Sequence, residues 1–469
     1  MVNLANQRGL AAMRKAQDLW SGPTGFILAT IGAAVGLGSI WKFPYEVGAN
    51  GGGAFILFYL LGLVLIVFPL MLVEYAIGRR GRSDAAHAIA NVAQEMGASR
   101  LWALIGLMGI ITAFLILSFY SVIGGWAIAY AVDTASRGLA GLEAASAQAR
   151  FDALMASPAR MTAYHLVYMA AVAFIVAHGI ASGIEKACKI LMPILIVLIL
   201  CLSVFSLAIG DVKATLRFLF QLDPRHLTLS AALDALGLGF FSIGVGLALM
   251  ITYAAYAGGD IDLRKVAIIT IAGDTAVSLA AGFAIFPIVF AEGLDPASGP
   301  GLMFVTLPLA FARIPGGEAA ALGFFLLLVV AAIASGISML EMAVSALSQR
   351  SWSRAQASLA TAVACWVCGL TTVLSFNVWS GWHPLSAMPA FSNATIFVLL
   401  DHLTSNIMLP LGGFVLAVFA GWVLPERLLL AELGLKPGTA RLLQLLLRTI
   451  VPACIAVVTV FPLFSNKLQ

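Results

Sequence analysis

The stretch from Gly32 to Phe55, GAAVGLGSIWKFPYEVGANGGGAF, decides the fold of this chain. It is apolar enough to lie in a lipid bilayer, yet it contains seven glycines and Pro44. Each glycine weakens a helix by up to ~1 kcal/mol relative to alanine, and proline weakens it more. We therefore expect a membrane helix that is interrupted, and an interruption inside a bilayer must be stabilised by protein or by bound ligands.

The composition of the whole chain is that of a polytopic membrane protein. Of its 469 residues, 61% are hydrophobic and only 10% are charged, and the mean hydropathy is +1.01. A soluble chain of this length needs a far more charged surface. The net charge of +4 is too small to favour a nucleic-acid partner. Five cysteines lie in or beside apolar runs, and we interpret them as small buried side chains, although Cys365 and Cys368 have a redox-like spacing.

Eleven apolar runs are long enough to cross a bilayer, which takes about 20 helical residues. We expect an all-α integral membrane protein with transmembrane helices near 21–45, 52–78, 101–132, 161–180, 185–209, 233–257, 264–291, 318–347, 356–376, 394–423 and 441–464. The first run is too long for a cleavable signal peptide. The segment 292–317 is apolar but short and rich in Pro and Gly. We expect it to form a re-entrant or lid-like hairpin packed on protein, rather than an ordinary exposed loop.

The distribution of Lys and Arg predicts the orientation in the membrane. An odd number of helices places the two termini on opposite sides. With the N-terminus inside, the cytoplasmic segments carry sixteen Lys and Arg residues and the outer segments carry nine, with Arg448 inside the last helix. The positive-inside rule therefore favours a cytoplasmic N-terminus and an outer C-terminus.

A second run, FFSIGVGLALMITY (240–253), is interrupted by Gly244 and Gly246. Glycines in membrane helices often indicate only close helix packing. Here, however, the two interrupted helices would be the first members of two five-helix repeats, helices 1–5 and 6–10. Interruptions in corresponding positions of two repeats indicate a transporter site at mid-membrane. Freed carbonyls can bind cations there, and half-helix N-termini can bind a carboxylate.

Five stretches of the chain resemble one known family. They are the opening stretch, PLMLVEYAIGRRG (69–81), FFSIGVGLALMITYAAY (240–256), GPGLMFVTLP (299–308) and LDHLTSNIMLPLGG (400–413). From about residue 18 to about residue 425, the chain resembles the neurotransmitter:sodium symporter family, and most of all its bacterial, leucine-transporter-like amino-acid members of the eleven-helix type.

The resemblance implies a fold and an activity. The fold would be two inverted five-helix repeats, 21–209 and 233–425, joined by an outer loop at 210–232. A cytoplasmic N-terminal segment (1–20) and the eleventh helix with the C-terminus (426–469) would complete the chain. The activity would be sodium-driven uptake by alternating access across the plasma membrane, which is the inner membrane in a bacterium.

The resemblance also implies a substrate site at the two interruptions. Its residues would be Ala34, Leu37, Gly38, Ile116, Tyr120, Phe241, Gly244, Leu247, Ser335 and Met339. The amides of Leu37 and Gly38, with the hydroxyl of Tyr120, would hold the carboxylate of an amino acid, and carbonyls near the breaks would accept its ammonium group. Gly36 stands where monoamine carriers have an aspartate, which favours an α-amino acid.

The size of the expected pocket follows from small residues on the same helices. Gly244, Gly336 and Ser338 predict a roomy pocket that would admit Met, Leu or aromatic side chains.

Two sodium sites are implied in the same way. The first would use the carbonyl of Ala34, the side chains of Ser39, Ser242 and Asp274, and the substrate carboxylate. The second would use the carbonyls of Gly32, Val35 and Ala331 with the hydroxyl of Ser335. Oxygen ligands of this kind suit a hard cation. Ala334 stands where a further hydroxyl or carboxylate is common, so either the second site is weaker or the match along this helix is shifted by one residue.

The first site departs from the family pattern, since Ser39 and Asp274 both stand where an asparagine is usual. Chloride-dependent members bind an anion nearby, and the chain keeps Tyr59, Ser242 and Ser278 there but has Leu238 in place of a glutamine. Our hypothesis is that Asp274 supplies the negative charge itself, because a second buried anion would be repelled. We expect chloride-independent transport, with Asp274 a candidate to carry a proton on the return step. An exposed Asp274 in a loop is the alternative, and its apolar flanks disfavour it.

The remaining implied residues form gates. Lys42 and Asp401 match the outer gate pair, with Phe241 as a lid over the substrate. Trp20 and Tyr256 match part of the inner gate, but Gln17 and Gln349 replace its usual arginine–aspartate pair. Two further acids lie in apolar runs: Glu74, expected near the breaks, and Glu341, which is either functional or a polar anchor.

The main hypothesis is thus a sodium-coupled importer of a neutral, hydrophobic or aromatic L-amino acid. The alternatives are a symporter for a small amino acid, a non-transporting sensor on the same scaffold and a channel. No metal-binding histidine spacing, Walker loop, nucleophile elbow or HExxH occurs, so we expect neither an ATP-driven pump nor an enzyme. The expected partners are the amino acid and the lipid bilayer, with no obligatory protein partner.

Overall fold

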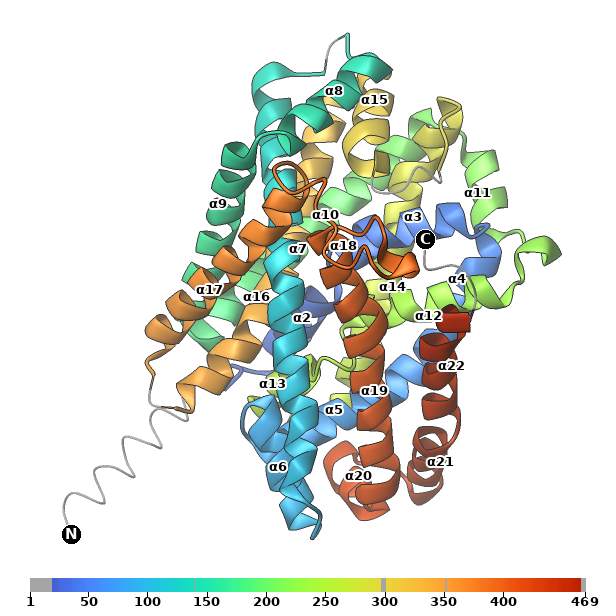
Figure 1. The fold of residues 1–469 in the computed structure, drawn as a ribbon. Helices are drawn as coiled ribbons and strands as arrows, with labels where there is room; N and C mark the ends of the chain where they lie inside the picture. Colours follow the sequence, from blue (N-terminus) through green and yellow to red (C-terminus); the bar gives the residue numbers. More distant parts are fainter. Residues whose placement is uncertain (1–18, 140, 297–300, 351, 465–469) are drawn as a thin grey trace.

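The computed structural model describes residues 19–139, 141–296, 301–350 and 352–464, and within these ranges it contains helices and no strand (Figure 1). The helices of the first half are α2 (Pro23–Ala34), η1 (Gly38–Lys42), α3 (Phe43–Ala49), α4 (Gly53–Gly62), η2 (Leu63–Val67), α5 (Phe68–Gly81), α6 (Ala85–Glu95), η3 (Arg100–Trp102), α7 (Ala103–Arg137), α8 (Ala144–Met155), α9 (Pro158–Ala177), η4 (Ile180–Glu185), α10 (Lys186–Ile209), α11 (Val212–Phe220) and η5 (Pro224–His226). Those of the second half are α12 (Leu229–Ile243), α13 (Leu249–Ala255), α14 (Leu263–Ala291), η6 (Leu302–Thr306), α15 (Leu307–Ala312), α16 (Gly317–Ser348), α17 (Arg354–Ser375), η7 (Pro389–Phe391), α18 (Ile396–Asp401), η8 (His402–Met408), α19 (Leu409–Val418), η9 (Phe419–Val423), α20 (Glu426–Leu433), α21 (Pro437–Arg448) and α22 (Ile450–Phe464).

The apolar helices of the described ranges are consistent with a multi-pass membrane protein. Nine are long and apolar enough to cross a bilayer, and a tenth span results if α2 and the η1–α3 helix, bent by 51°, are counted together. The expected span 233–257 is divided into α12 and α13, neither of which is long enough to cross alone. The predicted number of eleven spans therefore remains a prediction.

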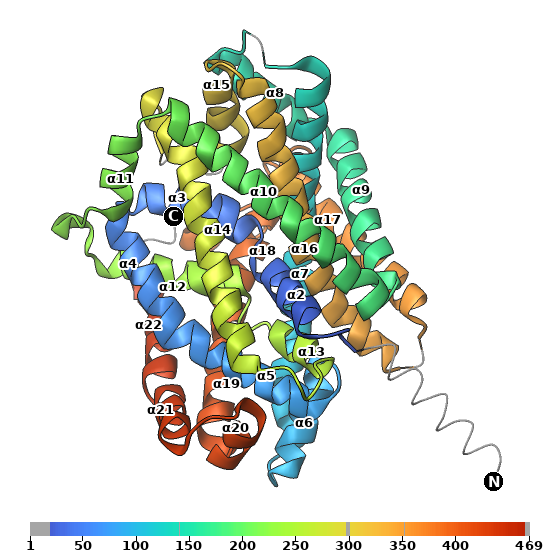
Figure 2. The same cartoon turned by 180° about the vertical axis from the view of Figure 1, so that it is seen from behind.

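The ends of the bundle differ in their surface helices. In Figure 1, α6, α20 and α21 lie at the lower end, and α8, α11 and α15 lie at the upper end. Figure 2 shows the same arrangement from behind, with α10 and α14 in front. Of the two parts of the first helix, α2 lies nearer the lower end and α3 nearer the upper end. We therefore name these ends the Trp20 end and the Lys42 end, after the predicted gate residues that precede α2 and α3 in the sequence.

The turn near the end of the opening stretch shows why glycines are needed there. Gly51 and Gly52 have φ of +81° and +65°, values that residues with a side chain rarely adopt. The amide of Gly52 donates to the carbonyl of Val47 at 2.9 Å, which closes α3. A β-carbon on Gly52 would overlap the carbonyl of Phe218, so the turn is also packed against α11.

The segment predicted to fold as a hairpin on the protein does pack there. Its described part forms η6 and α15, and Leu302, Met303 and Leu307 are fully buried. The ring of Phe304 lies 5.8 Å from that of Trp126 and 5.1 Å from that of Tyr130, centroid to centroid. Residues 297–300 lie outside the described ranges.

Candidate substrate and ion site

Both predicted helix interruptions are present, and the two helices contact one another. The first helix stops at Ala34 and continues from Gly38 at an angle of 51°. The second stops at Ile243 and restarts at Leu249. Between these points Gly244 and Gly246 have φ of +73° and +87°. Backbone groups in both gaps lack their helical partners and are free to bind other groups.

Glu74 of α5 supports the second interruption. Its side chain is fully buried, and its carboxylate accepts hydrogen bonds from the amides of Gly246 at 2.8 Å and Met250 at 3.1 Å. Ala248 lies between them with φ of +60°, which is uncommon for a residue with a side chain. Glu74 therefore satisfies buried amides that the broken helix leaves without a carbonyl.

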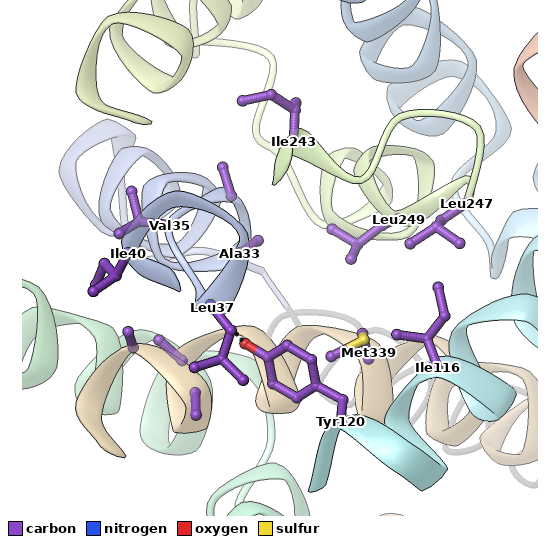
Figure 3. Close-up of a cluster of buried hydrophobic side chains, with 14 of the residues drawn as sticks. Ala33, Val35, Leu37, Ile40, Ile116, Tyr120, Ile243, Leu247, Leu249 and Met339 are labelled. Atoms are coloured by element: carbon purple, nitrogen blue, oxygen red, sulfur yellow. Dashed lines mark hydrogen bonds between the residues drawn. The ribbon is translucent and has the colours of Figure 1, made fainter. Parts of the chain in front are cut away.

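A cavity of about 40 Å³ lies between the two interruptions. Its lining consists of Ala33, Ala34, Gly36, Gly38, Ile116, Tyr120, Phe241, Ser242, Gly244, Leu247, Leu249, Ser335, Met339 and Leu409. Figure 3 shows Leu247 and Leu249 of the second broken helix facing Ile116 of α7 and Met339 of α16. All the residues predicted to contact the substrate line this cavity, except Leu37.

The backbone of Leu37 contacts Tyr120, which does line the cavity. Its amide donates a hydrogen bond of 3.1 Å to the hydroxyl of Tyr120 (Figure 3). A β-carbon on the neighbouring Gly36 would overlap the hydroxyls of Ser335 and Tyr120. A carboxylate side chain at position 36 would not fit there without displacing both.

The predicted roominess of the pocket is wrong in part. Gly336 faces away from the cavity and lies against the hydroxyl of Tyr168, and the hydroxyl of Ser338 is 2.7 Å from that of Tyr253. Three lining residues were missed: Ala33, Leu249 and Leu409. Leu249 directly follows the glycines of FFSIGVG and could have been found from them, whereas no sequence signal singles out Leu409.

Asp274 of α14 lies at the centre of a buried polar cluster. Its carboxylate accepts hydrogen bonds from the hydroxyls of Ser39 at 2.5 Å, Ser242 at 3.0 Å and Tyr59 at 2.9 Å. Asp274 is fully buried, so the alternative of an exposed loop residue is excluded. Ser278, expected in the same cluster, is buried, but its hydroxyl has no hydrogen-bond partner in the described part of the chain.

The predicted ligands of the second ion site also converge. The hydroxyl of Ser335 lies 3.4 Å from the carbonyl oxygens of both Gly32 and Val35. Ala331 is buried one turn earlier on α16, and Ala334 contributes no polar atom of its side chain. Three oxygens from two helices therefore lie within reach of one cation.

At the Lys42 end, the predicted outer gate is not closed by an ion pair. Lys42 and Asp401, which the structure describes, both line a second cavity of about 320 Å³, and no salt bridge joins them. The ammonium nitrogen of Lys42 instead lies 4.7 Å from the centre of the Phe241 ring, and Asp401 accepts a hydrogen bond from Ser405. Phe241 lines both cavities, and its role as a lid remains a prediction.

At the Trp20 end, polar contacts join the first helix to its neighbours. Trp20 donates from its indole nitrogen to the carbonyl of Tyr253 at 2.9 Å and from its amide to that of Tyr256 at 3.2 Å. Of the two glutamines predicted here, Gln349 is exposed and Gln17 lies outside the described residues. Their assignment to the inner gate therefore remains a prediction.

Glu341 has partners at this end that the sequence did not reveal. The hydroxyl of Tyr256 donates to its carboxylate at 3.0 Å, and the guanidinium of Arg354 lies 2.5 Å from it. The buried acid thus joins the predicted gate residue Tyr256 to the start of α17.

An all-helical membrane protein with two opposed helix interruptions around buried oxygen ligands has the architecture of a secondary transporter. Residues 17–148 and 150–466 match the model of the sodium:neurotransmitter symporter family, and the chain belongs to that family. The family consists of sodium-coupled transporters, so this chain is a sodium-dependent symporter of a small molecule and not an enzyme.

Similar proteins cover nearly the whole chain. An uncharacterised sodium-dependent transporter of Bacillus subtilis, YhdH, is 36% identical over 94% of this chain and 96% of its own length. One from Haemophilus influenzae is 31% identical over 88% and 91%. The solved structure of MhsT in complex with L-phenylalanine superposes with a TM-score of 0.86, at 38% identity, over 94% of this chain and 99% of that one.

Proposed function

We propose that this symporter takes up a neutral α-amino acid with an apolar side chain. The observation that carries the proposal is the lining of the central cavity, in which no described side chain is charged. The Leu37 amide and the Tyr120 hydroxyl at one edge suit a carboxylate, and Leu247, Leu249 and Met339 suit an apolar side chain. An ionic side chain would be left there without a partner. The phenylalanine bound to the relative MhsT supports the same substrate class.

Two sodium ions would accompany the substrate. Ser39, Ser242 and Asp274 would ligate the first ion with the substrate carboxylate, and Ser335 would ligate the second with carbonyls of both helices. Sodium would replace the hydrogen bonds that join these oxygens, because oxygen ligands of this type suit a hard cation. Asp274 would supply the fixed negative charge, which makes chloride unnecessary, and it could carry a proton on the return step. The charge distribution supports the Trp20 end as cytoplasmic.

Uptake into proteoliposomes tests this function. With an inward sodium gradient, a radiolabelled apolar amino acid should accumulate above its equilibrium level, and replacing chloride by gluconate should leave the rate unchanged. Loss of uptake in gluconate would overturn chloride independence alone. Binding without accumulation would favour a sensor, and currents that do not saturate with substrate would favour a channel.

The size of the substrate is a separate question, and the cavity of about 40 Å³ favours a small amino acid as the second candidate. Larger substrates require Met339 or the leucines to move, which a flexible methionine does at low cost. The melting temperature can be measured in sodium and in potassium with each of seven amino acids: Gly, Ala, Val, Leu, Met, Phe and Trp. The stabilisation that depends on sodium then shows which side-chain sizes the pocket binds. Stabilisation by Gly and Ala alone would support the second candidate.

A further inference from the structure

Tyr168 of α9 reaches a carbonyl of α16 that lies beside the second ion site. Its side chain is fully buried, and its hydroxyl donates a hydrogen bond of 2.6 Å to the carbonyl oxygen of Ala332. In an α-helix this carbonyl already accepts from the amide four residues later, so the tyrosine is an additional donor from outside the helix. The two residues are 164 positions apart, and the bond ties two transmembrane helices together.

Glycines on two other helices make room for the side chain of Tyr168. A β-carbon on Gly124 of α7 would overlap the tyrosine ring, and one on Gly336 of α16 would overlap its hydroxyl. Val172, one turn further along α9, lies against the same face of Gly336. Both glycines thus make room for the ring and hydroxyl of Tyr168 at one position along the bundle. The hydroxyl therefore has little freedom to move away from the carbonyl of Ala332.

The bonded carbonyl belongs to the helical turn that supplies the predicted ligands. Ala332 follows Ala331, whose carbonyl is one ligand, and precedes Ser335, whose hydroxyl is another. That hydroxyl lies 3.4 Å from the carbonyls of Gly32 and Val35 on the opposite helix. A small rotation of α16 would move both α16 ligands away from the cation position.

The second ion site depends on the position of this α16 turn more than a site with additional side-chain oxygens would. Ala334 offers no side-chain oxygen, so Ser335 is the one hydroxyl that α16 contributes among the predicted ligands. Removing a group that hydrogen-bonds to a metal ligand and orients it commonly changes the affinity of the site for the metal.

We propose that Tyr168 is a positioning residue for the second sodium site. Its hydroxyl fixes the turn from Ala331 to Ser335 so that the α16 ligands face those of the first helix. This role rests on the proposed assignment of the second site, and the experiment separates the two.

The test is a sodium titration of the purified protein in nanodiscs without amino acid, at constant ionic strength with potassium. The proposed first site lacks its substrate ligand under these conditions, so the titration reports mainly on the second. Thermal stabilisation gives the half-saturating sodium concentration. For Tyr168→Phe we expect it to rise about fivefold, the worth of one buried hydrogen bond. Tyr130→Phe, which removes a buried hydroxyl with no partner in the described chain, should leave it unchanged.

Two further variants keep the proposal falsifiable. Gly336→Ala displaces the Tyr168 hydroxyl and should produce the same shift even if Tyr168→Phe folds poorly. Ala334→Ser adds a hydroxyl at the site and should restore affinity in the Tyr168→Phe background. An unchanged half-saturation in Tyr168→Phe and Gly336→Ala, with a clear shift in Ser335→Ala, would overturn the role of Tyr168 alone. No shift in Ser335→Ala would overturn the second site itself, and the role of Tyr168 with it.

Discussion

Arg354, the first residue of α17, forms an ion pair of 2.5 Å with Glu341, which lies 13 residues earlier on α16. The Glu341 side chain is fully buried, whereas that of Arg354 is 19% exposed. The same guanidinium donates to the carbonyl of Val176, at the end of α9. Because Tyr256 donates to Glu341 as well, one carboxylate connects the second broken helix to α9, α16 and α17. In this chain Gln17 and Gln349 cannot form the usual ion pair, and the Glu341–Arg354 pair is a charged contact near the predicted inner gate.

Replacing Glu341 by Gln should loosen the Trp20 end. The change leaves Arg354 and the Tyr256 hydroxyl without their charged partner, and breaking a buried pair costs about 3 kcal/mol. We expect faster hydrogen exchange of the backbone over 19–34 and a lower melting temperature. The double variant Glu341→Gln/Arg354→Gln should recover part of the stability, because no unpaired charge remains. Equal exchange over 19–34 in the wild type and Glu341→Gln would show that the pair does not stabilise this end.

A second contact at the Trp20 end can be tested separately. Glu185 of η4 accepts from the amide of Ser21 at 2.8 Å and also bonds its hydroxyl, and Lys189 lies 2.6 Å from the same carboxylate. Glu185→Gln should speed exchange over 19–34, because the amide group is a weaker acceptor than a carboxylate. Exposed Glu143→Gln serves as the control. If exchange changes only around 180–189, the contact stabilises α10 rather than the first helix.

The fold was predictable because its signals are local. Long apolar runs identify membrane helices, and the glycines of both broken helices lie where the chain leaves helical geometry. The gate contacts were not predictable, since Ser21 with Glu185 and Tyr256 with Glu341 pair residues far apart in sequence, and charge alone does not choose partners. Gly336 was assigned to the wrong side of its helix, because a glycine that serves a neighbouring tyrosine looks the same in sequence as one that widens a pocket.

Asp274→Asn should weaken sodium binding and create a response to chloride. The variant keeps the size of the side chain but removes the charge that Ser39, Ser242 and Tyr59 surround. Hydrogen bonds to charged groups are worth about 1.5–3 kcal/mol, so the half-saturating sodium concentration for uptake should rise about tenfold or more. Chloride should restore part of the uptake by the variant, because a chloride ion in this cluster is no longer repelled by a buried carboxylate. Asp152→Asn, at an exposed residue of α8, is the control. Wild-type sodium affinity in the Asp274→Asn variant would exclude Asp274 as a ligand.

Leu249→Ala should shift the substrate preference toward bulkier amino acids. Leu249 lines the central cavity opposite Met339, and its truncation removes three carbon atoms from the wall (Figure 3). A pocket discriminates one methylene group by about 1–3 kcal/mol, so the ratio of half-inhibitory concentrations for Ala and Phe should change about tenfold or more in favour of Phe. Competition against a labelled substrate in sodium measures this ratio. Leu229→Ala, at the exposed start of α12, should leave it unchanged. An unchanged ratio in Leu249→Ala would show that this side chain does not limit the size of the bound amino acid.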